Sequence, residues 1–127
     1  MTSGFVLGPG EGRAYGFHGS AAVIKASGDD TLGQLGVMES DYPSGLVVSP
    51  HVHEGEDEML YVLAGELTGF CDDDGWVATP GSFVFVPRDC CHGFAVTSAA
   101  PARVLVVTGP SRLAGEIAAA GQPPPLL

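Results

Sequence analysis

Residues 45–58, GLVVSPHVHEGEDE, decide the fold and contain most of the chemistry of this chain. His51 and His53 are two residues apart, and on a β-strand this spacing puts both side chains on one face. Glu58 follows a short turn, and paired strands lie about 4.8 Å apart, so it can stand beside the two imidazoles. The stretch therefore predicts a hairpin with two imidazoles and a carboxylate on the same face.

A third histidine, His92, opens a later apolar segment and can close the same site from the side. Three imidazoles and one carboxylate suit a divalent transition metal, and this ligand set does not select among Fe, Ni, Mn, Zn, Co and Cu. One or two coordination positions stay open on a six-coordinate ion, which is typical of a catalytic site. An H-x-H pair alone is more often a surface or core feature. The predicted metal ligands are His51, His53, Glu58 and His92, and Glu58 is also the candidate general base.

Short apolar segments recur every 8–12 residues on both sides of this stretch, separated by turn residues. With 19 Gly and 10 Pro in 127 residues, this pattern predicts an all-β sandwich or barrel. A single helix is expected at 113–120, with Ser111 at its start and Gly121 at its end. Asp74-Gly75 is a hairpin signal. The expected strands are 21–26, 32–39, 46–53, 58–63, 66–70, 76–78, 82–86, 92–97 and 102–108.

The chain is long enough for one domain, and its composition divides it into three parts. Residues 1–13 are Gly-rich with few apolar anchors and are expected to form a flexible N-terminal arm. Residues 14–110 hold the strands and form the predicted barrel. Residues 111–127 are expected to hold the short helix and a Pro-rich extended tail.

The net charge of −10, without any Lys/Arg cluster, argues against binding to nucleic acid or to anionic membrane surfaces. No apolar run approaches the roughly 20 residues that span a bilayer. No signal peptide is visible, and a cytoplasmic location is expected.

The three cysteines are odd in number and Cys90 and Cys91 are adjacent, so a disulfide framework is not expected. Both are interpreted as packing residues rather than nucleophiles.

Two motifs in this chain resemble those of the cupin family. The first, G-x5-H-x-H-x3,4-E-x6-G, is met at every spacing by Gly45, His51, His53, Glu58 and Gly65. The second, G-x5-P-x-G-x2-H-x3-N, is met by Gly81, Pro87 and His92, whereas Asp89 replaces the second glycine and Val96 the final asparagine. The resemblance implies a cupin β-barrel (a double-stranded β-helix, or jelly roll), one divalent metal on the four ligands named above, and a homodimer.

A narrower resemblance is to the single-domain, quercetin 2,3-dioxygenase-like cupins. It rests on EDEMLYVLAGEL (56–67), PGSFVFVPR (80–88) and PARVLVV (101–107). It implies a dioxygenase-type oxidoreductase that acts with O₂ on a small enolisable or aromatic substrate. The alternatives are a non-oxidative cyclase or isomerase of small-molecule, polyketide-like metabolism, and a non-catalytic module that binds a metal and a small ligand. The departure at Val96 puts any substrate contact made by the family's asparagine in doubt.

The same spacing separates Glu58 from its acidic neighbours. Glu54, Glu56 and Asp57 fall in the turn and are expected to be solvated, whereas Glu58 stands at the family position and begins an apolar run. Side chains alternate in direction along a strand. Leu60 and Val62 are therefore expected to point inward with Glu58, and Val96 and Phe94 to point inward with His92. For the aromatic residues the alternative is plain core packing. The candidate pocket residues are Met38, Leu60, Val62, Phe83, Phe85, Phe94 and Val96.

Overall fold

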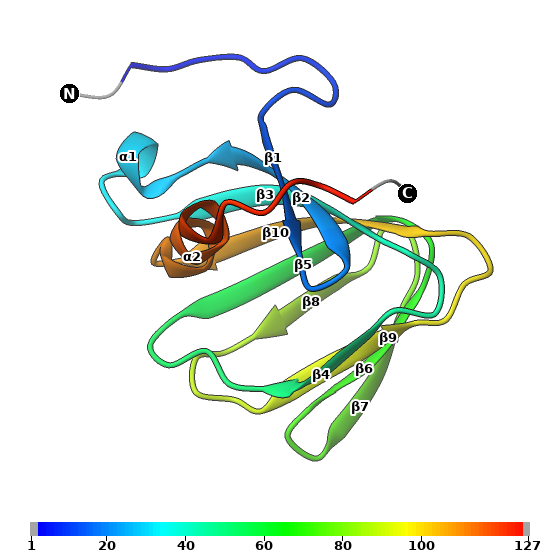
Figure 1. Ribbon diagram of the computed structural model, residues 1–127. Helices are drawn as coiled ribbons and strands as arrows, with labels where there is room; N and C mark the ends of the chain where they lie inside the picture. Colours follow the sequence, from blue (N-terminus) through cyan, green and yellow to red (C-terminus); the bar gives the residue numbers. More distant parts are fainter. Residues whose placement is uncertain (1–2, 126–127) are drawn as a thin grey trace.

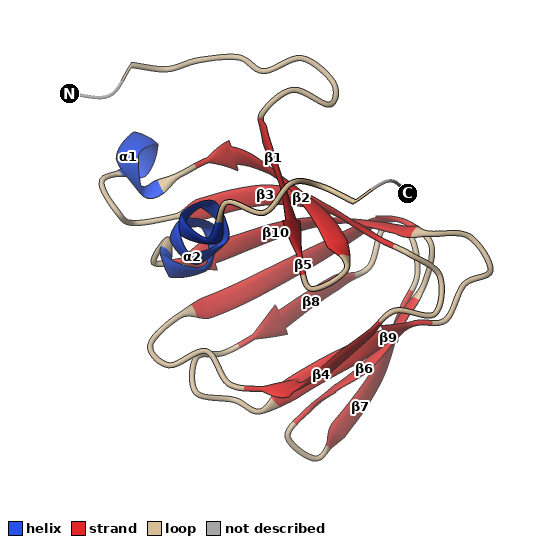
Figure 2. Cartoon of the chain, viewed as in Figure 1, coloured by secondary structure: helices blue, strands red, loops and turns tan. Residues whose placement is uncertain are grey.

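The computed structural model describes residues 3–125, which form two antiparallel sheets that face each other (Figure 1). The larger sheet has the strand order β1 (Arg13–Phe17), β2 (Ser20–Ala26), β3 (Gly36–Tyr42), β10 (Ala102–Gly109), β5 (Asp57–Ala64), β8 (Phe83–Val86). The smaller sheet has the order β4 (Val47–His51), β9 (His92–Val96), β6 (Leu67–Cys71), β7 (Asp74–Ala78). Two helices, α1 (Gly28–Thr31) and α2 (Arg112–Ala120), lie beside the larger sheet (Figure 2).

The chain passes repeatedly between the two sheets from β3 onward. Strands β3, β5, β8 and β10 lie in the larger sheet, and β4, β6, β7 and β9 lie in the smaller one. This alternation is the winding of a jelly roll, and it confirms the predicted all-β cupin barrel with a short C-terminal helix. No helix among residues 3–125 is long and apolar enough to cross a membrane.

The core lies between the two sheets, and every second residue of a strand points into it. On β10, Val104 and Val106 are buried, and they face inward together with Leu60 and Val62 of the neighbouring β5. Removal of these apolar side chains from water is the main stabilising term of the fold. The smaller sheet supplies Leu67, Phe94 and Val96 to the same core, and α2 covers one end with Leu113, Ala114 and Ile117.

Local structure differs from the sequence-based expectation at four places. Residues 45–58 do not form the predicted hairpin, because β4 pairs with β9 in the smaller sheet and β5 lies in the larger sheet. The strand expected at 32–39 begins only at Gly36, because Ser27 and Asp30 form a capping box that starts the short α1. The strand β1 was not predicted, since it alternates poorly and carries few apolar residues. The hairpin between β6 and β7 does not turn at the expected Asp74-Gly75. Cys71 pairs with Asp74, so the turn lies before Asp74 and includes Asp72, which has a φ of 49°.

Candidate metal centre

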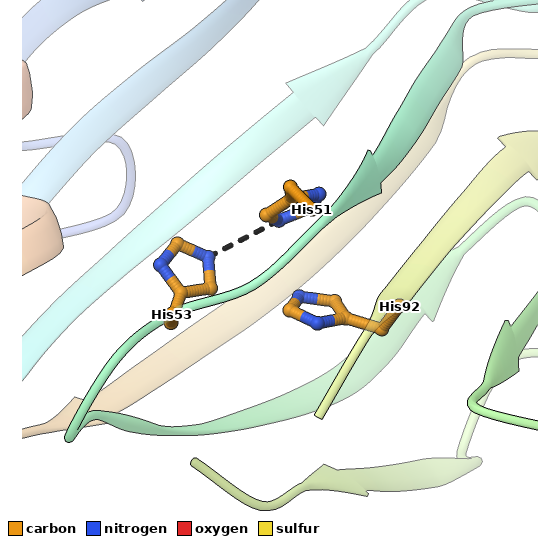
Figure 3. Close-up of side chains that lie close together, drawn as sticks. All are labelled: His51, His53 and His92. Carbon is orange, nitrogen blue, oxygen red and sulfur yellow. Dashed lines mark hydrogen bonds between the residues drawn. The ribbon is translucent and has the colours of Figure 1, made fainter. Parts of the chain in front are cut away.

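The three predicted histidine ligands meet at one end of the smaller sheet (Figure 3). His51 ends β4 and lies opposite His92 of β9 in the strand register, and His53 follows two residues later. Their ligand nitrogens all lie within 4.8 Å of one another. The Nε2 atoms of His51 and His53 are 3.2 Å apart, and the ring centroids of His51 and His92 are 4.1 Å apart.

Backbone carbonyls orient two of the three rings. His51 Nδ1 lies 2.8 Å from the carbonyl oxygen of Ser49, and His92 Nδ1 lies 3.0 Å from that of Cys90. A carbonyl can only accept, so these contacts assign the N–H to Nδ1 in both neutral imidazoles. Nε2 then presents its lone pair, as in metal sites where a hydrogen bond at the other ring nitrogen fixes the orientation of a histidine ligand.

The Glu58 carboxylate stands beside this group rather than within it. Its Oε2 lies 3.1 Å from His53 Nε2, at an angle poor for a hydrogen bond, and the three histidines alone form the tight cluster of ligand atoms. Contact with Glu58 is the largest cause that raises the pKa of His53, whereas burial lowers the pKa of His92. Burial therefore favours the neutral form of His92, whereas the contact with Glu58 favours the protonated form of His53.

The donor set fits a divalent transition metal. Among the residues that the structure describes, His92 Nε2 and Glu58 Oε2 are both buried side-chain atoms without a hydrogen-bond partner. An unpaired buried acceptor costs free energy, and a cation between these atoms would satisfy both. His51, His53 and His92 would hold such an ion, with Glu58 within reach on β5 as the fourth ligand.

Glu56 is not solvated, so the prediction that it belongs to an exposed acidic turn is wrong. Its side chain is only 3% exposed, and Oε2 accepts a hydrogen bond of 3.0 Å from the backbone N–H of Leu113. Oε1 lies 3.8 Å from His53 Nδ1. The physical reason is the first turn of α2, whose free N–H groups and positive dipole end draw the carboxylate inward. Glu56 thereby connects the metal-binding loop to α2.

The other two acids of the turn behave differently. Glu54 is exposed, as expected, and its carbonyl oxygen accepts a 2.9 Å hydrogen bond from Arg112. Asp57 forms an ion pair with Arg88 at 3.1 Å, and this pairing lowers the pKa of Asp57. Neither carboxylate is directed toward the histidines.

Asp89 replaces a motif glycine and takes over its conformation. Its φ of 68° lies in the left-handed region, which aspartate tolerates better than most residues. Its Oδ1 accepts a 3.0 Å hydrogen bond from the N–H of Gly55, and its own N–H donates to the carbonyl of His53. The substituted residue therefore ties the two motif loops together.

A cavity of about 500 Å³ opens in front of the histidines, between the two sheets and α2. His51, His53 and Glu58 line it, and His92 is buried behind them. Of the seven predicted pocket residues, Met38 and Phe94 line this cavity. Its other walls are formed by Phe17, His18, Ser20, Ala22, Ser40, Tyr42, Leu46, Val47, Val48, Ser49, Pro50, Val106, Leu113, Glu116 and Ile117.

The prediction that Phe83 and Phe85 line the pocket is wrong. Both lie on the outer face of the larger sheet, 61% and 51% exposed. The register explains this, because Glu58 pairs with Val86 and therefore Val84 and Val86 share the inner face of β8. Leu60, Val62 and Val96 do point inward as alternation predicts, but they pack in the core away from the cavity wall.

Several cavity residues were missed by the sequence analysis. Leu113, Glu116 and Ile117 all line the cavity, and their i, i+3, i+4 spacing on α2 was a signal that could have found them. Tyr42 lies across the cavity, and its pKa is raised by burial and then by the charge of Glu58. His18 is exposed and stands at the cavity rim.

Comparison with known proteins agrees with this architecture. A quercetin 2,3-dioxygenase of Bacillus subtilis is 32% identical over 94 residues, which are 74% of this chain and 28% of that protein. This chain therefore spans little more than a quarter of the length of that relative.

Two solved structures are similar in fold. KdgF from a Halomonas species has a TM-score of 0.74 at 21% identity, and the match covers 85% of this chain and 94% of the other. An RmlC-like cupin from Shewanella frigidimarina has a TM-score of 0.74 at 19% identity, covering 87% and 94%. The family model described as "Cupin domain" matches residues 38–108, more than half of the sequence and both histidine motifs. By its jelly roll, its motifs and this match, the chain belongs to the cupin family.

Proposed function

We propose that the protein is a metal-dependent enzyme of the dioxygenase type, similar to quercetin 2,3-dioxygenase, which acts on a small enolisable or aromatic substrate. The observation that carries the proposal is the convergence of three histidine Nε2 atoms and a buried carboxylate on one wall of a largely apolar cavity. A volume of about 500 Å³ is within the range of small-molecule sites. The 32% identity to a protein of that name supports the reaction class.

The ligands have distinct roles in this proposal. His51, His53 and His92 would hold the ion as neutral imidazoles, and Glu58 would supply the fourth ligand and one negative charge. When bound, a divalent ion lowers the pKa of a coordinated hydroxyl group, and a redox-active ion also couples an electron-rich substrate to O₂.

Glu58 is also the proposed general base. A substrate that binds through an ionised hydroxyl must give up a proton, and the Glu58 carboxylate is adjacent to the ligand cluster. The carboxylate has two oxygens, so one would hold the ion and the other would accept this proton. Phe94, Met38 and Val106 line the cavity with apolar surface, which excludes water from a reactive intermediate.

Metal analysis combined with oxygen consumption tests this function. The protein loaded separately with Fe, Ni, Mn, Co, Cu or Zn is mixed with flavonol-like and other enolisable substrates, and O₂ uptake is recorded. Uptake with a redox-active metal and none with zinc is expected. Conversion without O₂ would replace the dioxygenase by a cyclase or isomerase, and tight binding without conversion would indicate a binding module.

The metal ligands are tested separately from the reaction. The double variant His51→Ala, His53→Ala is expected to lose the metal. His18→Ala, which removes an exposed histidine from the rim of the same cavity, is the matched control and is expected to keep it. Retention of the metal by the double variant would overturn the site.

We also propose that the protein is a homodimer. The outward-facing Phe83 and Phe85 lie on β8, the edge strand of the larger sheet, beside the exposed Tyr61 and Leu63 of β5. A contiguous apolar face with an open sheet edge is the kind of surface that a second copy covers. A cytoplasmic location remains a prediction from the sequence.

A further inference from the structure

No Lys or Arg residue lines the cavity. The sequence has five Lys and Arg residues in total, and every one lies within the described range. Arg13 and Lys25 line a different cavity, while Arg88, Arg103 and Arg112 contact acidic residues or carbonyls elsewhere. An anionic group of a ligand in this cavity would therefore meet no Lys or Arg.

The cavity does contain a second carboxylate, far in sequence from the motifs. Glu116 projects from α2 on the same face as the buried Leu113 and Ile117, and all three line the cavity. Glu116 itself is exposed, which places its carboxylate at the rim of the cavity. It is close enough to His53 to be among the charges that act on that imidazole, after Glu58 and Glu56.

The charges decide which ligands the cavity accepts. Three neutral imidazoles, the Glu58 carboxylate and a divalent ion leave a net charge near +1, which one ionised substrate oxygen neutralises. Any further negative charge on the substrate then faces Glu116 without a compensating cation. Two charges of like sign in a small, partly apolar cavity repel each other across it, because the effective dielectric constant there is below that of water.

We propose that Glu116 makes this cavity selective for uncharged, hydroxyl-bearing substrates that carry no anionic group apart from the oxygen given to the metal. The inference rests on the proposed function, and it narrows the substrate class. Carboxylated or phosphorylated molecules of the same size are rejected by charge, while Ser20, Ser40 and Tyr42 offer hydroxyl groups to a polar neutral ligand. Glu116 acts as a specificity-determining residue and does not take part in the reaction.

Two ligands of equal size test the proposal. The amide and the carboxylate of 3,4-dihydroxybenzoic acid both present a catechol to the metal, and they differ by one negative charge at the far end. Binding of each to the zinc-loaded protein is measured by calorimetry at about pH 8, where the benzoate carboxyl group is ionised. Zinc supports no oxidation, so the result does not depend on the dioxygenase reaction.

The wild-type protein is expected to prefer the amide. Glu116→Gln should reduce the amide-to-carboxylate affinity ratio several-fold, and Glu116→Lys should reduce it by about 10-fold. The matched control is Asp73→Lys, which makes the same change in net charge at an exposed hairpin turn and should leave the ratio unchanged. The intrinsic acidities of the two ligands are the same for every variant, so only the change in the ratio is interpreted.

The outcomes separate the two proposals. An unchanged ratio in Glu116→Lys, or an equal change in Asp73→Lys, would overturn the role of Glu116. Failure of the protein to bind zinc would overturn the metal function instead, and the same titrations on metal-free protein would still report whether Glu116 discriminates by charge. Because Glu116 is exposed, its substitution is not expected to unfold the chain.

Discussion

The carboxylate of Glu56 accepts a 3.0 Å hydrogen bond from the backbone N–H of Leu113, and this bond joins the metal-binding loop to the first turn of α2. The same helix presents no side-chain cap of its own, since Ser111 stands at the N-cap position without such a bond. A residue 57 positions earlier in the chain therefore caps α2. The loop that carries His53 and the helix that covers the cavity are held together at this point.

Replacement of Glu56 by alanine is expected to lower the free energy of unfolding of the metal-free protein by about 1–2 kcal/mol, because a buried N–H loses its partner. The Glu56 carboxylate also lies near His53 Nδ1, so metal affinity should fall by about 10-fold. Chemical denaturation measures the first effect and calorimetric metal titration the second.

Two variants make the Glu56 result specific. Glu56→Gln keeps an oxygen acceptor for Leu113 and should recover most of the stability. Glu54→Ala removes an exposed acid from the same turn and should change neither quantity. A stability loss in Glu54→Ala equal to that in Glu56→Ala would contradict the role assigned to Glu56.

The pKa values of the ligands predict how metal binding depends on pH. The contact with Glu58 raises the pKa of His53 above 6.5, and burial lowers that of His92. The contact therefore stabilises the metal-free fold below the unfolded pKa, and this contribution is lost as the pH rises through the raised pKa. A metal needs the unprotonated nitrogen, so its affinity should rise over the same interval.

NMR titration of the metal-free protein checks this order directly. The His53 resonances should titrate at higher pH than those of His92, and Glu58→Gln should move the His53 transition downward. If His92 titrates above His53, the assignment of the proton to the His53–Glu58 pair is wrong.

Gly65 and Gly45 have nearly the same backbone conformation, with φ of 78° and 80°, but different surroundings. A Cβ at Gly65 would lie 2.6 Å from the Cα of Ala102, whereas a Cβ at Gly45 would meet no atom within 4 Å. Gly45→Ala should therefore cost about 1 kcal/mol from the left-handed conformation alone. Gly65→Ala should cost clearly more, or prevent folding, in thermal denaturation; equal costs would contradict the close approach.

Light scattering tests the proposed dimer face. Phe83→Asp is expected to convert the dimer to a monomer, because a charge would be buried in an apolar interface. Val77→Asp is the matched control, since Val77 is also 61% exposed and lies on β7, the edge strand of the other sheet. A monomeric wild-type protein, or dissociation by Val77→Asp, would contradict this face.

Local spacing predicted much of the site. His51, His53 and Glu58 do come together as predicted, with Glu58 Oε2 3.1 Å from His53 Nε2. The predicted cause is wrong, because His53 lies in the loop after β4, and β4 and β5 belong to different sheets instead of pairing. The inward direction of Leu60 and Val62 was predicted from the alternation of side chains along a strand, and it is confirmed.

Contacts between distant elements could not be predicted in this way. The outward direction of Phe83 depends on its pairing with Tyr61, and a shift of one residue would have reversed it. The burial of Glu56 depends on the position of α2 in the fold, and the residues next to Glu56 in the sequence do not determine that position. The cavity wall on α2 has a readable helical spacing, but its position over the histidines arises only from the packed structure.

The metal ligands and part of the cavity rim belong to different elements, and this has a consequence for how such a protein can evolve. The imidazoles belong to β4, β9 and the loop between β4 and β5, whereas two exposed residues of the cavity rim, His18 and Glu116, belong to the β1–β2 hairpin and to α2. Exposed positions of these two segments can be mutated without loss of the Leu113–Glu56 hydrogen bond that links α2 to the metal-binding loop. A laboratory library confined to them would explore new substrates on a constant chemical centre, and natural descendants have the same freedom.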